Sequence, residues 1–222
     1  MKRLALALAL LLASSGCYWS SPPSTPHRSV RFDVGATPDL GKPQIPALAG
    51  NRLVVLGRFD TTAGNPIGGL YDRKDYEVSA LQRTYFFKDG AVEIFEHVSD
   101  GLRASGLPVL KDYAGRAEPA LVEPAVRAQA PMLVSATVTA LQHDQIRDKK
   151  ESVDVEVGLL EVALLVRDVN GKVVLGKTYR VEGRYPYDGL TDMLKLLGWK
   201  LAEKLTSDPA FIAAVGATKK GG

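Results

Sequence analysis

The chain has 222 residues, of which 45% are hydrophobic and 24% charged, a composition typical of a globular protein with one apolar core. Its formal net charge is +3, and leaving out Lys2 and Arg3 reduces the 28 basic residues to 26 against 25 acidic ones. This balance gives no electrostatic basis for binding nucleic acid, which needs clustered Lys and Arg. A single cysteine excludes an intrachain disulfide.

The N-terminus has the features of a signal peptide. Lys2 and Arg3 are followed by an apolar run of ten residues, Leu4–Ala13. At about 1.5 Å per residue, this run would cross only half of a roughly 30 Å hydrocarbon layer. We therefore expect a cleaved leader over residues 1–16 rather than a membrane span.

The only cysteine, Cys17, follows directly after Ser14, Ser15 and Gly16. This pattern resembles the lipobox of bacterial lipoproteins, although Ser14 stands where leucine is usual. The resemblance implies cleavage before Cys17, diacylation of its thiol and acylation of the new amino terminus, an essentially permanent anchor. Tyr18 replaces the aspartate that commonly retains lipoproteins in the inner membrane, so the outer membrane, facing the periplasm, is expected. A plain secretory signal with an incidental cysteine is the alternative.

Residues 17–48 are predicted to form a tether that carries the lipidated Cys17. The stretch is rich in proline, serine and glycine, which favours an extended and solvated chain. Within it, only Ser29–Val34 alternates like a short strand.

A single domain is expected over residues 49–216. Its first half is predicted to contain a buried strand, a loop, an edge strand and a helix, in that order: Arg52–Phe59, Asp60–Asp75, Tyr76–Lys88 and Gly90–Ser105. Apolar residues at helical spacing support the helix, with Asp89 as a favourable N-cap and Gly106 as the C-terminal stop.

The middle of the domain is predicted to alternate between strand and helix. Three elements follow: a short strand at Leu107–Leu110, a helix at Pro119–Ala130 that Pro124 kinks or shortens, and a strand at Met132–Leu141. The polar run after this strand, HDQIRDKKES, is read as a turn.

Two further strands form the predicted hairpin of the C-terminal half. In Ser152–Arg167 the apolar residues change parity in mid-strand, which favours a β-bulge at Gly158. Asn170-Gly171 predicts a type I′ turn, and the returning strand runs from Val173 to Val181.

The chain is predicted to end in helices. Leucines on one stripe indicate a helix at Leu190–Leu205, with Asp188 or Thr191 as its N-cap. Asp208-Pro209 opens a last short helix to Val215, and residues 217–222 are expected to be a disordered tail. Together these elements predict an α+β fold: a mostly antiparallel sheet with a three-strand C-terminal meander and helices packed on one face.

Candidate catalytic residues are few. His143, Asp144 and Asp148 form a possible acid–base or metal cluster, but a solvated charge run is the favoured interpretation. His97 is read as a rim residue of its helix, and no pair of histidines has the spacing of a zinc site. We therefore predict no catalytic, cofactor-binding or metal-binding residue.

Two further features, a glycine-rich loop and a group of aromatic residues, are candidates for contacts with a partner. The glycine-rich Gly64–Gly69 lacks the lysine of a phosphate-binding loop, so it is read as a turn-rich contact loop. Tyr185, Tyr187 and Trp199 are possible interface aromatics, although core or rim packing is the favoured interpretation.

Most of the mature chain resembles the YajG-like lipoproteins of Gram-negative bacteria. The resemblance depends on the lipobox leader, on RLVVLGRFD with its following polar loop, on the helix ending at Gly106, and on MLVSATVTAL, DVNGKVV and LTDMLKLLGWKLAEKL. It implies an envelope lipoprotein, and it supplies no catalytic residues because the matching patterns concern the fold.

These observations predict a non-catalytic binding or structural component of the cell envelope. Its expected partners are the membrane, through Cys17, and other envelope proteins. The alternative is an accessory lipoprotein subunit of an envelope transport or secretion complex.

Overall fold

The computed structural model describes residues 43–62, 68–74, 77–85, 90–113, 117, 119–148, 153–186 and 190–220. All of them belong to one compact unit, Arg31–Gly222. Its elements in chain order are β1 (Leu48–Ala49), β2 (Val54–Gly57), β3 (Asp60–Thr61), β4 (Gly68–Lys74), β5 (Glu77–Tyr85), α2 (Gly90–Ala104), β6 (Val109–Asp112), α3 (Pro124–Arg127), β7 (Met132–Asp148), β8 (Val153–Arg167), β9 (Val173–Pro186), α4 (Leu190–Ser207), α5 (Pro209–Ala214) and β10 (Thr218–Lys219).

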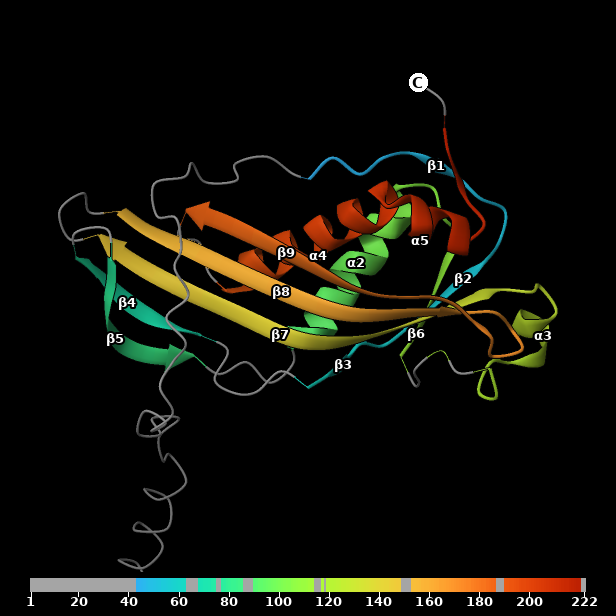
Figure 1. The fold of residues 1–222 in the computed structure, drawn as a ribbon, viewed down its shortest axis with the longest axis horizontal. Coiled ribbons are helices and arrows are strands. Elements are labelled where there is room, and N and C mark those ends of the chain that lie inside the picture. Colours follow the sequence, from blue (N-terminus) through green and yellow to red (C-terminus); the bar gives the residue numbers. More distant parts are fainter. Residues whose placement is uncertain are drawn as a thin grey trace, which may run out of the picture. The chain divides into compact units, whose positions relative to one another are not determined.

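The long strand β7 organises an eight-stranded sheet (Figure 1). Along one edge it pairs antiparallel with β8, and β8 pairs antiparallel with β9, so the predicted meander is confirmed. Along its other edge β7 pairs with β2, β3 and β4 in turn, all parallel, while β6 and β5 flank β2 and β4. The sheet is therefore mixed, with most of its paired residues in antiparallel ladders.

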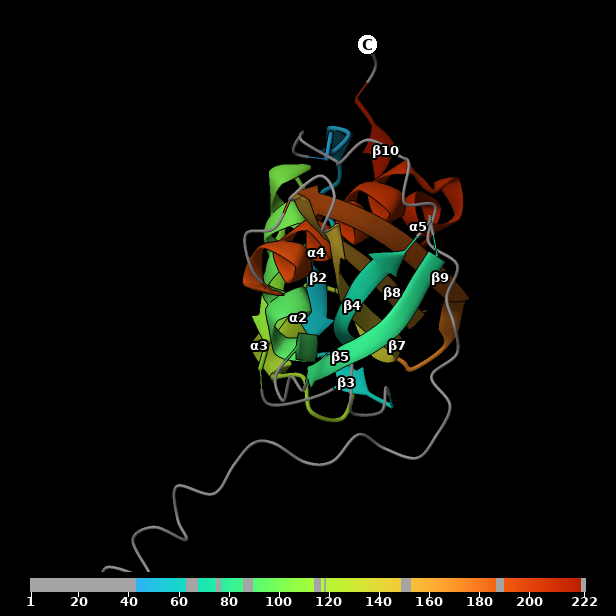
Figure 2. The ribbon, with the colours of Figure 1, turned by 90° about the vertical axis from the view of Figure 1, so that its left-hand side faces the viewer.

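Helices α2 and α4 cover one face of this sheet, as predicted (Figures 1 and 2). Alternate residues of the strands point to the helices and form the main core, which is the expected consequence of the period of two. The most buried of these strand residues are Leu56, Val134, Val138, Leu160, Val162, Leu164, Val166 and Tyr179. Ile94, Phe95, Val98 and Leu102 of α2 and Leu194, Leu197, Leu201 and Leu205 of α4 complete the core.

Glycines allow α4 to lie close to the sheet. Gly158 and Gly183 are paired on neighbouring strands, directly beneath α4. A Cβ on Gly158 would lie 2.5 Å from the sulfur of Met193, and one on Gly183 would lie 2.9 Å from Leu196 Cδ2. Because these distances are shorter than ordinary contacts, a side chain here would displace the buried side chains of α4 or lift the helix from the sheet.

A second, smaller core lies on the opposite face of the sheet at one end. Val55 and Leu133 point away from α2 and α4 and pack with Ala117. Val122 and Val126, from the segment that contains α3, cover this cluster. The α3 segment therefore covers part of the sheet face that is opposite to α2 and α4.

The two ends of the described chain meet. Leu48 is fully buried, its backbone N–H donates to Ser105 O at 2.7 Å, and β1 pairs antiparallel with β10. Residues 43–48 were predicted as tether and 217–220 as disordered tail, but here Leu48 belongs to the core and Thr218–Lys219 to a strand. The prediction of disorder is therefore wrong for residues 217–220.

The prediction of a loop at Asp60–Asp75 is wrong in part. Gly68–Lys74 form β4, which pairs with β5 on one side and with β7 on the other. Residues 63–67 and 75–76 lie outside the described residues. Pairing on both sides supplies hydrogen bonds that outweigh the low strand propensity of the glycines and the aspartate.

The helix predicted at Pro119–Ala130 is only one turn long in the structure. Helix α3 begins at Pro124, with proline in its first turn, and ends at Arg127. Pro124 cannot donate to a preceding carbonyl, so the helix begins at it rather than passing through it. Residues 119–122 form turns instead.

The predicted bulge at Gly158 is also wrong. Strand β8 pairs without interruption through Gly158 on both edges, and the irregularity lies in β7 at Thr139. The parity change has another cause: Val157 and Leu159 are buried on the face opposite to Leu160 and Val162. This part of β8 is therefore buried on both faces.

The predicted hairpin at Asn170-Gly171 is confirmed, but its turn is of a different type. Gly171 has a φ of +83°, whereas Asn170 is not among the residues with positive φ. Gly171 N–H donates to Asp168 O, and Asp168 N–H donates to Lys172 O. This arrangement is the three-residue loop in which a type I turn is followed by a left-handed glycine. The Asp168 carboxylate stabilises it by accepting from the N–H groups of Asn170 and Lys172, both at 2.9 Å.

Replacing Gly171 with valine should lower the free energy of unfolding by about 1–3 kcal/mol, because a β-branched residue is strained at positive φ. For a chain of this size, that corresponds to a fall in melting temperature of roughly 3–10 °C, measurable by circular dichroism. Gly171→Asn is the matched control, since asparagine tolerates the left-handed region, and it should lose much less. An unshifted melting temperature for the valine variant would count against this turn.

Candidate functional site

The face of the meander turned away from the long helices carries small and polar side chains. Two rows cross the three strands there: Ser135, Leu165 and Gly176 are paired neighbours, as are Thr137, Ala163 and Thr178. Thr178 is exposed, and Ser135, Thr137, Ala163 and Leu165 are half-buried. Small residues in adjacent rows of a sheet leave a depression because no side chain rises to fill it.

This depression is a hollow of about 330 Å³. Its lining comes from all three strands and consists of Ser135, Thr137, Ala163, Leu164, Leu165, Gly176, Lys177 and Thr178. The hydroxyl groups of one serine and two threonines can donate and accept hydrogen bonds there, and Leu165 and Ala163 supply apolar contact. We call this surface the meander hollow, and its size is comparable to that of the smaller ligand sites.

Charged residues surround the meander hollow. Arg167 donates from Nη1 to Ser135 Oγ at 3.1 Å, and Thr139 Oγ1 donates to the Glu161 carboxylate at 2.9 Å. Arg180 pairs with Glu182 at 2.7 Å on the exposed surface. Arg167 thus places a guanidinium, which carries five N–H donors, at the border of the hollow. The chemistry of this surface is hydrogen bonding and charge pairing.

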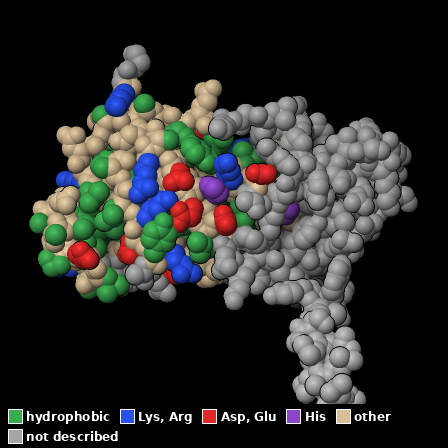
Figure 3. Space-filling model, turned by 180° about the vertical axis from the view of Figure 1, so that it is seen from behind, with side chains coloured by type: hydrophobic (Ala, Val, Ile, Leu, Met, Phe, Trp, Pro, Cys, Tyr) green, Lys and Arg blue, Asp and Glu red, His purple; other side chains and the backbone are tan. Residues whose placement is uncertain are grey.

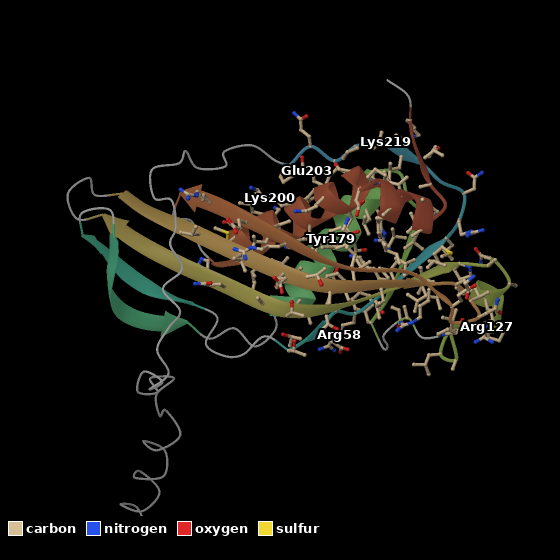
Figure 4. All side chains as sticks on the ribbon, viewed as in Figure 1. Arg58, Arg127, Tyr179, Lys200, Glu203 and Lys219 are labelled. Carbon is tan, nitrogen blue, oxygen red and sulfur yellow. The ribbon has the colours of Figure 1, made fainter. Side chains whose placement is uncertain are left out.

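The outer edge of β9 borders the meander hollow, and α4 covers half of that edge. Lys204 Nζ donates to Arg180 O and Lys200 Nζ donates to Glu182 O, both at 2.9 Å (Figure 4). Lysine side chains on edge carbonyls protect a strand against pairing with another chain. The part of the edge at Gly176 and Thr178, beside the hollow, remains exposed.

A polar cluster fastens α5 to β9. The Asp208 carboxylate accepts from Lys177 Nζ and from Tyr179 OH, each at 2.7 Å, and from Ala210 N–H at 3.0 Å, so Asp208 is the predicted N-cap of α5. The hydrogen bond from Lys177 is the main reason that the pKa of Asp208 is lowered. Burial is the main reason that the pKa of Tyr179 is raised well above its usual value.

Replacing Asp208 with alanine should lower the free energy of unfolding at neutral pH by about 2 kcal/mol, because a cap and the partner of a half-buried hydroxyl are lost together. A lowered pKa in the folded state means that the ionised Asp208 stabilises the fold above its ordinary pKa of 3.8. That stabilisation is lost as the pH falls from about 4 through the lower folded value. Denaturant unfolding from pH 7 to pH 2.5 should therefore show the difference between wild type and variant shrinking at acid pH, and a constant difference would contradict this account.

The helical face carries a second group of charges, where acidic and basic side chains alternate around a histidine (Figure 3). Lys111 Nζ lies 2.6 Å from Glu96 and 3.1 Å from Asp100. Burial alone would lower the pKa of Lys111, but hydrogen bonds to both carboxylates outweigh it and raise this pKa. His97 lies 3.7 Å from Glu93, and burial lowers its pKa, so the imidazole is neutral at pH 7. These contacts bind α2 to β6 and form a structural network.

The candidate histidine–aspartate cluster lies in a strand and not in the predicted turn. His143, Asp144 and Asp148 all belong to β7, so the prediction of a turn is wrong for residues 143–148. His143 is 3% exposed and is paired with Gly158 of β8. Pairing along both edges of β7 extends the strand through a polar run that would otherwise favour a turn.

The remaining predicted contact residues are dispersed. Gly68 and Gly69 belong to β4, and Tyr185 and Pro186 end β9; Gly64–Ile67 and Tyr187 lie outside the described residues. Trp199 is half-buried on α4, near Gly101 of α2, which supports the interpretation as rim packing. His97 lies on α2, half-buried at the rim as predicted. Cys17, Asp89 and Asp188 also lie outside the described part, and Thr191 falls within α4 rather than at its N-cap.

Sequence reasoning did not find the meander hollow. The alternation in MLVSATVTAL shows that Ser135 and Thr137 share one face of their strand. The hollow also requires Ala163 beside Thr137 and Gly176 in the same row as Ser135, and this depends on the strand register. Gly176 inside the returning strand was the available signal, because a glycine in a strand often marks a close approach of another group.

Within the described residues, no three His, Cys, Asp or Glu side chains are grouped closely enough to hold a metal ion. No helix in that part of the chain is both long and apolar enough to span a membrane.

Comparison with known proteins finds distant similarity to several solved structures. No family model and no curated protein matches the chain. A PelC dodecamer variant from Paraburkholderia phytofirmans is 18% identical with a TM-score of 0.42, over 79% of this chain and 95% of that one. A putative neuraminyllactose-binding hemagglutinin homolog from Helicobacter pylori is 13% identical with a TM-score of 0.41, over 82% and 97%.

Lipoprotein GNA1162 from Neisseria meningitidis is 9% identical with a TM-score of 0.35, over 71% of this chain and 99% of that one. A minor lipoprotein from Acinetobacter baumannii is 12% identical with a TM-score of 0.33, over 76% and 96%. The solved structures similar to this chain thus include lipoproteins of Gram-negative bacteria.

Proposed function

We propose that the protein is an envelope lipoprotein held in the outer membrane through lipidated Cys17, with its domain in the periplasm as a non-catalytic binding component. The single observation that carries this proposal is the leader that ends at the only cysteine. The leader has the parts of a lipoprotein signal in the right order: Lys2 and Arg3, the apolar run Leu4–Ala13, small residues and then Cys17. The YajG-like pattern of the mature chain supports the same assignment.

The meander hollow is the surface we assign to binding. It combines three hydroxyl groups, the guanidinium of Arg167 and an exposed strand edge at Gly176 and Thr178. Such a surface recognises the polar groups of another envelope component. Its residues come from the hydrogen-bonded strands β7, β8 and β9, whose register fixes their geometry.

Replacement of Cys17 with serine tests the anchor. The variant should lose labelling with radioactive palmitate and leave the membrane fraction, or accumulate with its leader uncleaved. Ser15→Thr, a small change beside the cysteine, is the matched control and should still be labelled. If palmitate labelling and membrane fractionation are unchanged in Cys17→Ser, the proposal is wrong.

A further inference from the structure

Most of the large exposed hydrophobic side chains of the described chain gather at one end. Leu121 is 65% exposed, Val173 51%, Val174 44% and Leu110 41%; Tyr113, at 56%, lies apart against Phe95. We call the first four the apolar end. Exposed apolar groups that gather at one place mark an interaction surface, whereas scattered ones need no explanation.

The strand register places Leu110 and Val173 at the same end of the sheet, on its two opposite edges. Leu110 pairs with Val55, Val55 with Leu133, Leu133 with Arg167, and Arg167 with Val173. Leu110 and Val173 are therefore the two ends of one row across the sheet. The α3 segment covers the middle of the row, through Val122 and Val126. Leu121, next to Val122 in that cover, is exposed.

The β8–β9 hairpin joins the α3 segment at this end. A Cβ on Gly171 would lie 3.5 Å from Pro119 Cγ, an ordinary contact, so the hairpin tip and the α3 segment touch. In the view from behind, hydrophobic side chains gather at the same end of the described domain (Figure 3). The apolar end thus combines the hairpin tip and the α3 segment with Leu110 and Val173 at the two edges of the sheet.

The cover over this row is apolar on its outside as well. Its exposed residues include Ala120, Leu121, Pro124, Ala125, Ala128 and Ala130. The exposed cations Arg127 and Lys172 flank it, with Arg127 at the extreme of the domain (Figure 4). Among the described residues of this cover, Glu123 is the exposed acid, and the Asp168 carboxylate accepts from the hairpin backbone. Apolar tips with flanking Lys or Arg suit the interface of an anionic bilayer.

We propose that the apolar end contacts a phospholipid membrane surface, with Leu121 and Val173 entering the interface. The occupant follows from the anchor, so this inference rests on the proposed function. Residues 17–42 extend at most about 85 Å at roughly 3.3 Å per residue, so the anchored domain stays within reach of the bilayer.

Because the domain is anchored, even a weak contact of the apolar end with the bilayer is enough to orient it. A tether converts the second contact into an intramolecular one, with an effective concentration on the order of millimolar. A surface of a few apolar side chains therefore orients the anchored domain even though it would not hold a free one on the membrane. The meander hollow, on the sheet face, is then presented at a defined height above the bilayer.

Single-cysteine labelling tests the contact directly. In residues 17–222 with Cys17→Ser, no cysteine remains, so Leu121→Cys provides one site for an environment-sensitive dye. Vesicles of phosphatidylethanolamine and phosphatidylglycerol, at millimolar lipid, should shift the dye emission to the blue. The same dye on Ala213→Cys, an exposed site of α5, should not respond. No shift at position 121 would overturn the proposal.

Charge substitution gives a second readout with the same vesicles. Leu121→Asp should reduce the partition coefficient at least tenfold, and Ala213→Asp, the same new charge elsewhere, should leave it within twofold. Melting curves identify any variant that does not fold, and the dye experiment then decides. A blue shift that grows with protein concentration without lipid would mean that a second copy covers this end, which contradicts the lipid assignment. Because these proteins lack Cys17, failure of the anchor proposal is measured separately, by palmitate labelling.

Discussion

Gly158→Val should lower the free energy of unfolding by about 3 kcal/mol or more, the largest effect expected of a single substitution in this domain. A Cβ at Gly158 would lie 2.5 Å from Met193 Sδ, 2.8 Å from Met193 Cγ and 2.9 Å from Leu197 Cδ1. Both partners are buried in the core under α4. Met193 and Leu197 must therefore repack, or the helix must move away from the sheet, to admit the valine side chain. Denaturant unfolding followed by circular dichroism measures the change.

Ala163→Val is the matched control for this prediction. Ala163 lies on the same strand, β8, but faces the meander hollow, where there is room for two methyl groups. We expect its free energy of unfolding to stay within about 0.5 kcal/mol of wild type. If Gly158→Val were as stable as Ala163→Val, the close approach of α4 to β8 would be wrong.

Gly101→Ala should destabilise the domain by about 2 kcal/mol, although alanine favours a helix over glycine by about 1 kcal/mol. The new Cβ would lie 2.4 Å from Ala202 Cβ, where α2 and α4 cross. Ala202→Gly removes that methyl group and should cost about 1–2 kcal/mol by itself. The double variant Gly101→Ala with Ala202→Gly moves the methyl from one helix to the other, so its stability should return close to wild type.

The double-mutant cycle isolates the contact. We expect a coupling energy of about 3–4 kcal/mol between the two sites, because each single change alters a gap that the other restores. Helix propensities cancel in the double variant, so they do not contribute to the recovery. Additive losses would show that α2 and α4 do not cross at Gly101 and Ala202.

The helices could be predicted because their signals are local. The apolar spacing from Val92 to Leu102 and the stop at Gly106, which has a φ of +97°, define α2 without reference to the rest of the chain. The same is true of α4 and of the Asp208 cap of α5. The hairpin also has a local signal in Asn170-Gly171, although the type of turn depends on the Asp168 carboxylate.

The parts that were predicted wrongly depend on long-range pairing. β4 contains Gly68 and Gly69 and still forms a strand, because β5 and β7 pair with its two edges. His143 lies in a strand for the same reason. At Gly158 the sequence indicates an unusual position, but only the distance to Met193 shows that the cause is helix packing rather than a bulge.

The candidate sites also differ in whether a local signal in the sequence or long-range strand pairing defines them. The lipidation of Cys17 stays a prediction, which depends on a contiguous signal of seventeen residues. The meander hollow could not be predicted, because Ser135, Ala163 and Gly176 meet only through the register of three strands. The apolar end likewise joins Leu110, Leu121 and Val173 across the sheet, and no periodicity in the chain connects them.

The most direct test of the central claim is the mass of the N-terminal peptide from the native protein extracted from membranes. The account predicts a peptide that begins at Cys17, with the added mass of a diacylglycerol on its thiol and of a fatty acid on its amino group. A peptide that begins at another residue with an unmodified Cys17, or one that retains Lys2–Gly16, would contradict it.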